Sequence, residues 1–106
     1  MKPRISWEGV FPAVTTQFHD DLSLDIDATA KVIEKLIDDG VSGLIICGSV
    51  GENTSLERSE KIAIMEAAKS VAAGRLPVLC GIAEFTTAFA VETAKEAARV
   101  GVDGIM

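Results

Sequence analysis

The sequence predicts an α/β fold, and more specifically the first three and a half β/α units of a (β/α)8 barrel, or TIM barrel. Short apolar runs alternate with longer segments of helical periodicity, which predicts parallel strands joined by right-handed crossovers. Helix-ending glycines at Gly40, Gly74 and Gly101 recur roughly every 30 residues, the length that a barrel of about 250 residues gives each unit. The last apolar run, residues 101–106, has no helix after it. We therefore expect residues 1–106 to be the N-terminal part of a single barrel domain.

The first half of the chain is predicted to hold two strands with a helix between them. Residues 9–16 are apolar with β-branched side chains and predict a strand, which Pro12 makes irregular because proline has no N–H. Asp25 is a suitable N-cap for a helix that continues at helical spacing as far as Gly40. Residues 41–47 then predict a strand that is apolar on both faces, as parallel strands covered by helices are.

The second half repeats this order of helix and strand. A helix is predicted over residues 57–73, with Thr54 as an alternative start because both positions resemble acidic helix openings. Residues 74–80 predict the next strand. A third helix, rich in alanine, is expected to be capped by Thr86 or Thr87.

The composition of the chain limits its partners. It has 106 residues and a formal net charge of −6 at pH 7, which disfavours nucleic acid because phosphate binding needs clustered Lys and Arg. No apolar run approaches the length of about 20 residues that spans a bilayer, and the N-terminus lacks a signal-peptide core. The two cysteines, Cys47 and Cys80, are expected to be buried thiols, and His19 to be exposed. We therefore expect a cytoplasmic protein without a nucleic-acid or membrane partner.

The loop after the strand at 41–47 is the stretch best suited to carry chemistry. Gly48 and Gly51 allow the backbone to approach a ligand closely, and Ser49 offers a hydroxyl. The N–H groups of such a loop are suited to a carboxylate or a phosphate. A plain strand-to-helix turn explains the two glycines equally well. The position favours a site, because barrels of this kind keep their active sites at the C-terminal ends of the strands.

The loop sequence Gly-Ser-Val-Gly-Glu at residues 48–52 resembles the Gly-Ser/Thr-Thr-Gly-Glu loop after strand two of the dihydrodipicolinate synthase/N-acetylneuraminate lyase family. Residues 9–15 resemble the family's first strand, and residues 56–60 the start of its second helix. Residues 74–78 and 101–104 resemble the segments that lead into strands three and four. The resemblance covers essentially the whole chain, and the order and spacing of these motifs make the combination specific.

The resemblance implies class I aldolase chemistry in a catalytic domain like that of 4-hydroxy-tetrahydrodipicolinate synthase. Such a lyase condenses or cleaves pyruvate or a related 2-oxo acid through a lysine Schiff base, with no cofactor and no metal. The lysine lies on strand six, a tyrosine from strand five relays protons, and the strand-two loop holds the substrate carboxylate. Carried over by position, the substrate-binding residues are Gly48, Ser49, Val50 and Gly51. Ser49 is also catalytic as part of the proton relay, and Glu52 orients the loop.

The sequence departs from the family pattern in three places. Val50 replaces the usual second threonine, so only its N–H remains for the carboxylate, which favours a relative with a different second substrate. Glu84 and Phe85 lie in a run that differs from the more common Gly-Thr-Gly after strand three. They either tune specificity at the mouth of the barrel or are a solvated acid and a packing aromatic. Thr16 stands where the family usually has proline.

The chain contains no tyrosine, and every lysine after Lys2 falls in a helix expected on the outside of the barrel: Lys31, Lys35, Lys61, Lys69 and Lys95. We therefore expect the Schiff-base lysine to lie outside this chain and the 106 residues alone to be inactive. The family also forms dimers and tetramers, so a homodimer or homotetramer is expected. Two alternatives stay open. One is a dehydratase of a 2-keto-3-deoxy sugar acid in the same family, and the other is a non-catalytic half-barrel that binds a small carboxylate.

Overall fold

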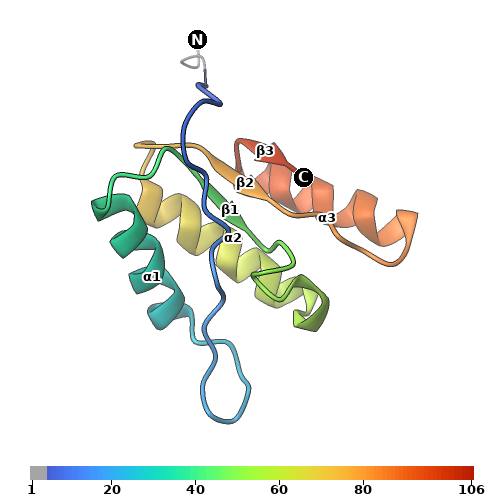
Figure 1. The fold of residues 1–106 in the computed structure, drawn as a ribbon. Coiled ribbons are helices and arrows are strands. Elements are labelled where there is room, and N and C mark those ends of the chain that lie inside the picture. The colour runs from blue at the N-terminus through green and yellow to red at the C-terminus, as the bar shows by residue number, and fades with distance from the viewer. Residues whose placement is uncertain (1–4) are drawn as a thin grey trace.

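Three helices and three short strands alternate along the chain in the computed structural model, which describes residues 5–106 (Figure 1). Residues 1–4, which the predicted domain includes, lie outside the described residues. In chain order the elements are α1 (Ile26–Asp38), β1 (Leu44–Ile46), the 3-10 helix η1 (Asn53–Ser55), α2 (Arg58–Ala72), β2 (Val78–Cys80), α3 (Thr87–Val100) and β3 (Gly104–Ile105). The helices lie side by side in one layer, with α2 between α1 and α3, and the strands form the second layer (Figure 1).

The strands form a parallel sheet in the order β1-β2-β3, as the alternation of strand and helix predicts. The register pairs Leu44 with Val78 and Ile46 with Cys80. Because the strands are parallel, the loops that follow β1 and β2 leave from the same edge of the sheet. The loop at residues 48–52 therefore lies next to the loop that begins at Gly81.

The predicted first strand, residues 9–16, is present only as a segment alongside β1 with a single parallel bridge, Ala13 to Ile45. The Val14 N–H donates to the Ile45 carbonyl at 2.8 Å, and the Ile45 N–H donates to the Pro12 carbonyl at 3.0 Å. Pro12 has no N–H to extend this ladder. The irregularity at Pro12 is therefore confirmed, but the predicted strand over residues 9–16 is reduced to this one bridge.

The helices begin at acidic or hydroxyl residues, as predicted. Asp25 caps α1 and Thr86 caps α3, each through a side-chain oxygen that accepts a backbone N–H of the first turn. Helix α2 begins after Glu57, whose N–H donates to the Glu60 carboxylate at 2.9 Å. Thr54 lies in η1 instead. Of the two predicted starts of this helix, Glu57 is therefore the correct one. In the part of the chain that the structure describes, none of the helices is long and apolar enough to cross a membrane.

The core lies between the helix layer and the sheet. Its fully buried large side chains include Ile33, Leu44, Ile46, Ile64, Met65 and Val78. Each such side chain stabilises the fold by about 1.5–3 kcal/mol through removal from water. Among residues 5–106, five polar side chains are also buried, namely those of Thr16, Thr29, Asn53, Lys61 and Thr93.

The expectation that the helical lysines all face outward is wrong for Lys61, which is only 3% exposed. On α2 it shares the buried face with Met65, Ala68 and Ala72, because residues four, seven and eleven apart lie on one side of a helix. Lys31, Lys35 and Lys95 are exposed as expected, and Lys69 is half-buried. A buried ammonium group needs hydrogen-bonding or charged partners. Those of Lys61 lie at the edge of the sheet where the strands end.

Candidate functional site

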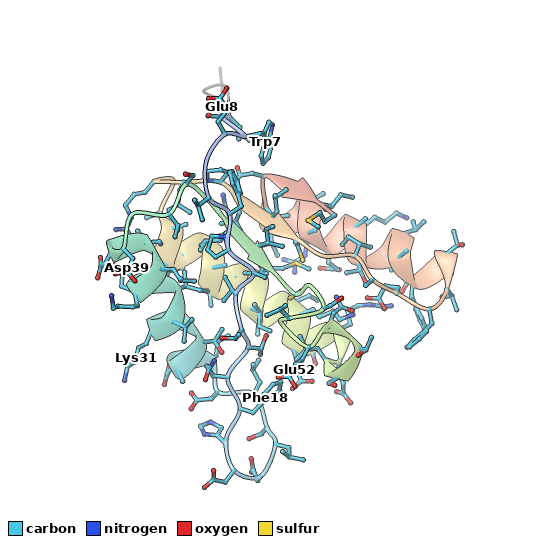
Figure 2. The ribbon with its side chains drawn as sticks, in the orientation of Figure 1. Trp7, Glu8, Phe18, Lys31, Asp39 and Glu52 are labelled. Carbon is cyan, nitrogen blue, oxygen red and sulfur yellow. The ribbon has the colours of Figure 1, made fainter. Side chains whose placement is uncertain are left out.

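The five predicted site residues lie in one tight turn at the C-terminal end of β1. The Glu52 N–H donates to the Ser49 carbonyl at 3.0 Å, and the Asn53 N–H donates to the Gly48 carbonyl at 3.2 Å. Ser49 and Val50 form the exposed tip of this turn, and Gly51 is buried. Figure 2 shows Glu52 at the end of the molecule opposite Trp7 and Glu8. The turn thus presents a hydroxyl and a stretch of backbone to solvent at the edge where the strands end.

The two glycines of the turn have different surroundings. A Cβ added at Gly51 would lie 3.0 Å from the Val14 carbonyl oxygen and 3.2 Å from the Cys47 nitrogen. A Cβ added at Gly48 would meet nothing closer than a methyl group of Ile45 at 3.9 Å. Gly51 is therefore required by close backbone packing, whereas Gly48 leaves open space that a ligand can use.

Cys47, just before the turn, and Glu52, its last residue, have left-handed backbone angles, with φ of 55° and 61°. A residue with a Cβ is disfavoured in this region by about 1–2 kcal/mol. Such conformations persist where the surrounding contacts hold them, and they gather at ligand-binding sites. The side chain of Glu52 is exposed, and its backbone N–H closes the turn. The loop-orienting role of Glu52 stays a prediction.

Thr16 ties the turn to the segment that precedes α1. Its hydroxyl donates to the Gly51 carbonyl at 2.7 Å, and the side chain is buried. Proline, which the family usually has at this position, has no donor for this bond. The departure at Thr16 therefore adds a hydrogen bond that fixes the buried end of the turn.

Asn53 connects the turn to the neighbouring loop, a role that the sequence analysis missed. Its side-chain N–H₂ donates to the Cys47 carbonyl at 2.6 Å and to the Gly81 carbonyl at 3.4 Å. Its Oδ1 accepts from the Lys61 ammonium at 3.1 Å. The side chain is 1% exposed, so all of these partners are inside the protein. The only sequence feature that could have indicated this role is the position of Asn53, an amide residue directly after Gly51 and Glu52.

Lys61 and Glu84 form a buried ion pair behind Asn53. The Lys61 Nζ lies 2.6 Å from the Glu84 Oε1, and the two side chains are 4% and 15% exposed. The Thr93 hydroxyl donates to the same oxygen at 2.9 Å. The hydrogen bond from Lys61 holds the pKa of Glu84 below its usual value, because it outweighs the opposing effect of burial.

The expectation that Glu84 is a solvated acid is therefore wrong. Phe85 is 91% exposed, so the expectation of a packing aromatic is wrong as well. The sequence did not reveal that Lys61 is buried, and without a buried lysine nearby Glu84 has no evident partner. A role of these two residues in specificity stays a prediction.

The cysteines and the histidine are placed as predicted. Cys47 and Cys80 are free and buried. The hydrogen bond between their side chains and the burial of Cys47 raise the pKa of that thiol, which makes Cys47 a poor nucleophile. His19 is exposed, with its Nδ1 3.4 Å from a carboxylate oxygen of Asp25. Among residues 5–106, we find no group of three or more His, Cys, Asp or Glu side chains that could hold a metal ion.

Comparison with known proteins identifies the family. The model of the dihydrodipicolinate synthetase family matches residues 6–106. The chain belongs to this family. It is 34% identical over 102 residues to 4-hydroxy-tetrahydrodipicolinate synthase of Moorella thermoacetica, covering 96% of this chain and 35% of that protein. It is 37% identical over 100 residues to a probable 2-dehydro-3-deoxy-D-pentonate aldolase of Escherichia coli, covering 94% of this chain and 33% of that protein.

A solved structure of the dihydrodipicolinic acid synthase family supports the same assignment. YagE of Escherichia coli K12, solved in complex with pyruvate, superimposes with a TM-score of 0.87 at 37% identity. The match covers 93% of this chain and 33% of that chain. The chain thus spans about a third of the length of the relatives it matches. The predicted family and the predicted fold class, the β/α pattern of the N-terminal part of the TIM barrel, are confirmed.

Proposed function

We propose that this chain supplies the loop that holds the substrate carboxylate in a lyase acting on pyruvate or a related 2-oxo acid. One observation carries the proposal. Among the described residues, the N–H groups of Ser49, Val50 and Gly51 donate no hydrogen bond within the chain. Successive N–H groups in a turn suit an anion, and those of Ser49 and Val50 belong to its exposed tip.

The catalytic consequence is positioning. A carboxylate held by the turn fixes the neighbouring keto carbon at a set distance and orientation for attack by an amine. The amine is a lysine outside this chain, which forms a Schiff base and so acts as a covalent catalyst. The exposed Ser49 hydroxyl is the catalytic group that this chain contributes, as one member of the proton relay. Gly48 leaves space for the ligand, and Glu52 orients the turn through its left-handed backbone.

Val50 supports a second candidate within the same chemistry. Its side chain is 56% exposed at the tip of the turn and cannot donate the hydrogen bond of the usual threonine. We infer a substrate other than that of the strict synthase, such as a 2-keto-3-deoxy sugar acid that is cleaved or dehydrated. The name of the similar Escherichia coli aldolase, which refers to a 2-dehydro-3-deoxy-pentonate, supports this choice. A non-catalytic half-barrel that binds a small carboxylate is the alternative of another class.

The proposal extends to the whole protein. We infer that residues 1–106 are the N-terminal part of a catalytic barrel domain and are inactive alone. The complete enzyme is then a cytoplasmic homodimer or homotetramer that needs no cofactor. Because the chain spans about a third of its relatives, the residues that complete the site lie in the remaining two thirds of such a barrel.

Borohydride trapping on the complete product of the gene that encodes residues 1–106 tests this function. A Schiff base with pyruvate is reduced to a stable secondary amine, which intact-mass spectrometry detects as one added pyruvate unit. Propionate, which has the carboxylate but no keto group, is the matched control and should leave no adduct. No adduct with any member of a panel of 2-oxo acids, sugar-derived ones included, would contradict the proposal.

A further inference from the structure

The Lys61 ammonium lies between acceptors from two different loops. Its Nζ donates to the Asn53 Oδ1 at 3.1 Å and to the Glu84 Oε1 at 2.6 Å. Asn53 follows the turn after β1, and Glu84 belongs to the loop after β2. The lysine side chain is 4% exposed, so its charge depends on these two partners in place of water. One ammonium group thus joins two loops at the edge of the sheet where the strands end.

The ammonium also determines which way the Asn53 amide faces. An ammonium group has only donors, so it must face the amide oxygen and leave the N–H₂ to point the other way. On that side the N–H₂ donates to the Cys47 carbonyl at 2.6 Å. Cys47 has a φ of 55° and directly precedes Gly48, so this bond holds the residue before the turn in its left-handed conformation. The Gly81 carbonyl accepts from the same N–H₂ at 3.4 Å, so the two carbonyls and the ammonium together fix the amide in this orientation.

Glu84 is held in place from the opposite side. The Thr93 hydroxyl of α3 donates to its Oε1 at 2.9 Å, so the carboxylate is fixed to a helix as well as to Lys61. The chain of contacts therefore runs from α3 through Glu84, Lys61 and Asn53 to the start of the turn. Glu84 lies in one of the segments where this chain differs from the usual family sequence.

We infer that Lys61 and Glu84 are positioning residues that set the conformation of the carboxylate-binding turn through Asn53. This inference rests on the proposed function of the turn. Neither residue touches the substrate. Removing either one weakens the contacts that hold the amide of Asn53 against the backbone of Cys47. A displacement of about 1 Å at a positioned group lowers activity by up to about 100-fold.

The test uses the complete gene product and measures how borohydride trapping depends on pyruvate concentration. Lys61→Met removes the ammonium, and Glu84→Gln keeps the shape of the acid while removing its charge. Lys69→Met is the matched control, because Lys69 is on the same helix and pairs with Asp103 at 3.3 Å. Asp103 accepts from the Val78 N–H at the start of β2, so the control pair lies at the opposite end of the sheet.

We expect Lys61→Met to raise the pyruvate concentration for half-maximal trapping by about 100-fold, and Glu84→Gln to raise it by about 10-fold or more. Lys69→Met leaves it unchanged. A loss of stability alone raises the half-saturating concentration only by the reciprocal of the folded fraction, so it produces no 100-fold rise while most molecules stay folded. This readout therefore separates positioning from a merely structural role. If Lys61→Met does not fold, the half-saturating concentration of Glu84→Gln alone tests the positioning role.

If Lys61→Met and Glu84→Gln both reach half-maximal trapping at the same pyruvate concentration as Lys69→Met, the inference is overturned while the proposed function stays intact. Trapping by the unsubstituted protein is measured first and distinguishes the two failures. If that protein forms no adduct with any 2-oxo acid, the proposed function is wrong, and the positioning role falls with it.

Discussion

Replacing Gly51 by alanine is expected to destabilise the protein, because the added Cβ enters space that backbone atoms already occupy. The Cβ would lie 3.0 Å from the Val14 carbonyl oxygen and 3.2 Å from the Cys47 nitrogen. Neither atom belongs to a flexible side chain, so the turn itself must move, at a cost of about 1–3 kcal/mol. Movement also weakens the hydrogen bond from Thr16 to the Gly51 carbonyl, which is worth about 1 kcal/mol. We expect a total loss of about 2–4 kcal/mol in the free energy of unfolding.

Urea unfolding followed by circular dichroism measures this loss, and Gly48→Ala is the matched control in the same turn. A Cβ at Gly48 has 3.9 Å to its nearest neighbour, so that variant should unfold at or slightly above the midpoint of the unsubstituted protein. If the proposed ligand site is right, Gly48→Ala nevertheless weakens pyruvate binding, because its methyl group occupies the open space. Equal stability of the two alanine variants would refute the packing argument for Gly51.

Three further predictions concern the turn and the ion pair behind it. Ser49→Ala should lower the turnover of the complete enzyme by about 10- to 1,000-fold, and an unchanged rate would remove Ser49 from the proton relay. Val50→Thr should tighten pyruvate binding by about 1 kcal/mol, the usual worth of one hydrogen bond. Val91→Thr, at an exposed valine on α3, is its control and should leave pyruvate binding unchanged. The pairing with Lys61 lowers the pKa of Glu84, so the stability it contributes is fully present above its unfolded pKa of about 4.3. That contribution is lost as the pH falls through the lower folded pKa. Urea midpoints of the unsubstituted protein and Glu84→Gln should therefore differ at neutral pH and converge in acid, and a constant difference would contradict this linkage.

The alternation of strands and helices was predictable because it depends on local signals. Asp25 and Thr86 cap their helices as their side chains predict, and the parallel order of the strands follows from the helical crossovers. The first strand was overpredicted, since apolar and β-branched composition does not reveal how far a segment pairs. Here the ladder beside β1 is limited to one bridge at Ala13 and includes Pro12, which has no N–H.

The location of the candidate site was also predictable, whereas the contacts that hold it were not. Glycine spacing and family resemblance point to residues 48–52, and the structure brings these residues together in one turn. Asn53, Lys61 and Glu84 come from three separate segments, so their contacts exist only after the sheet and helices assemble. A lysine is normally expected at the surface, and its burial becomes evident only when its partners are seen.

In the proposed function, the N–H groups at the tip of the turn hold the carboxylate of a 2-oxo acid. Titration of the ¹⁵N-labelled gene product with pyruvate, followed by amide chemical shifts, tests it most directly. We predict saturable shifts at the amides of Ser49, Val50 and Gly51, with the amide of Val91 on α3 unmoved. Saturable pyruvate binding that leaves these three amides unshifted would contradict it.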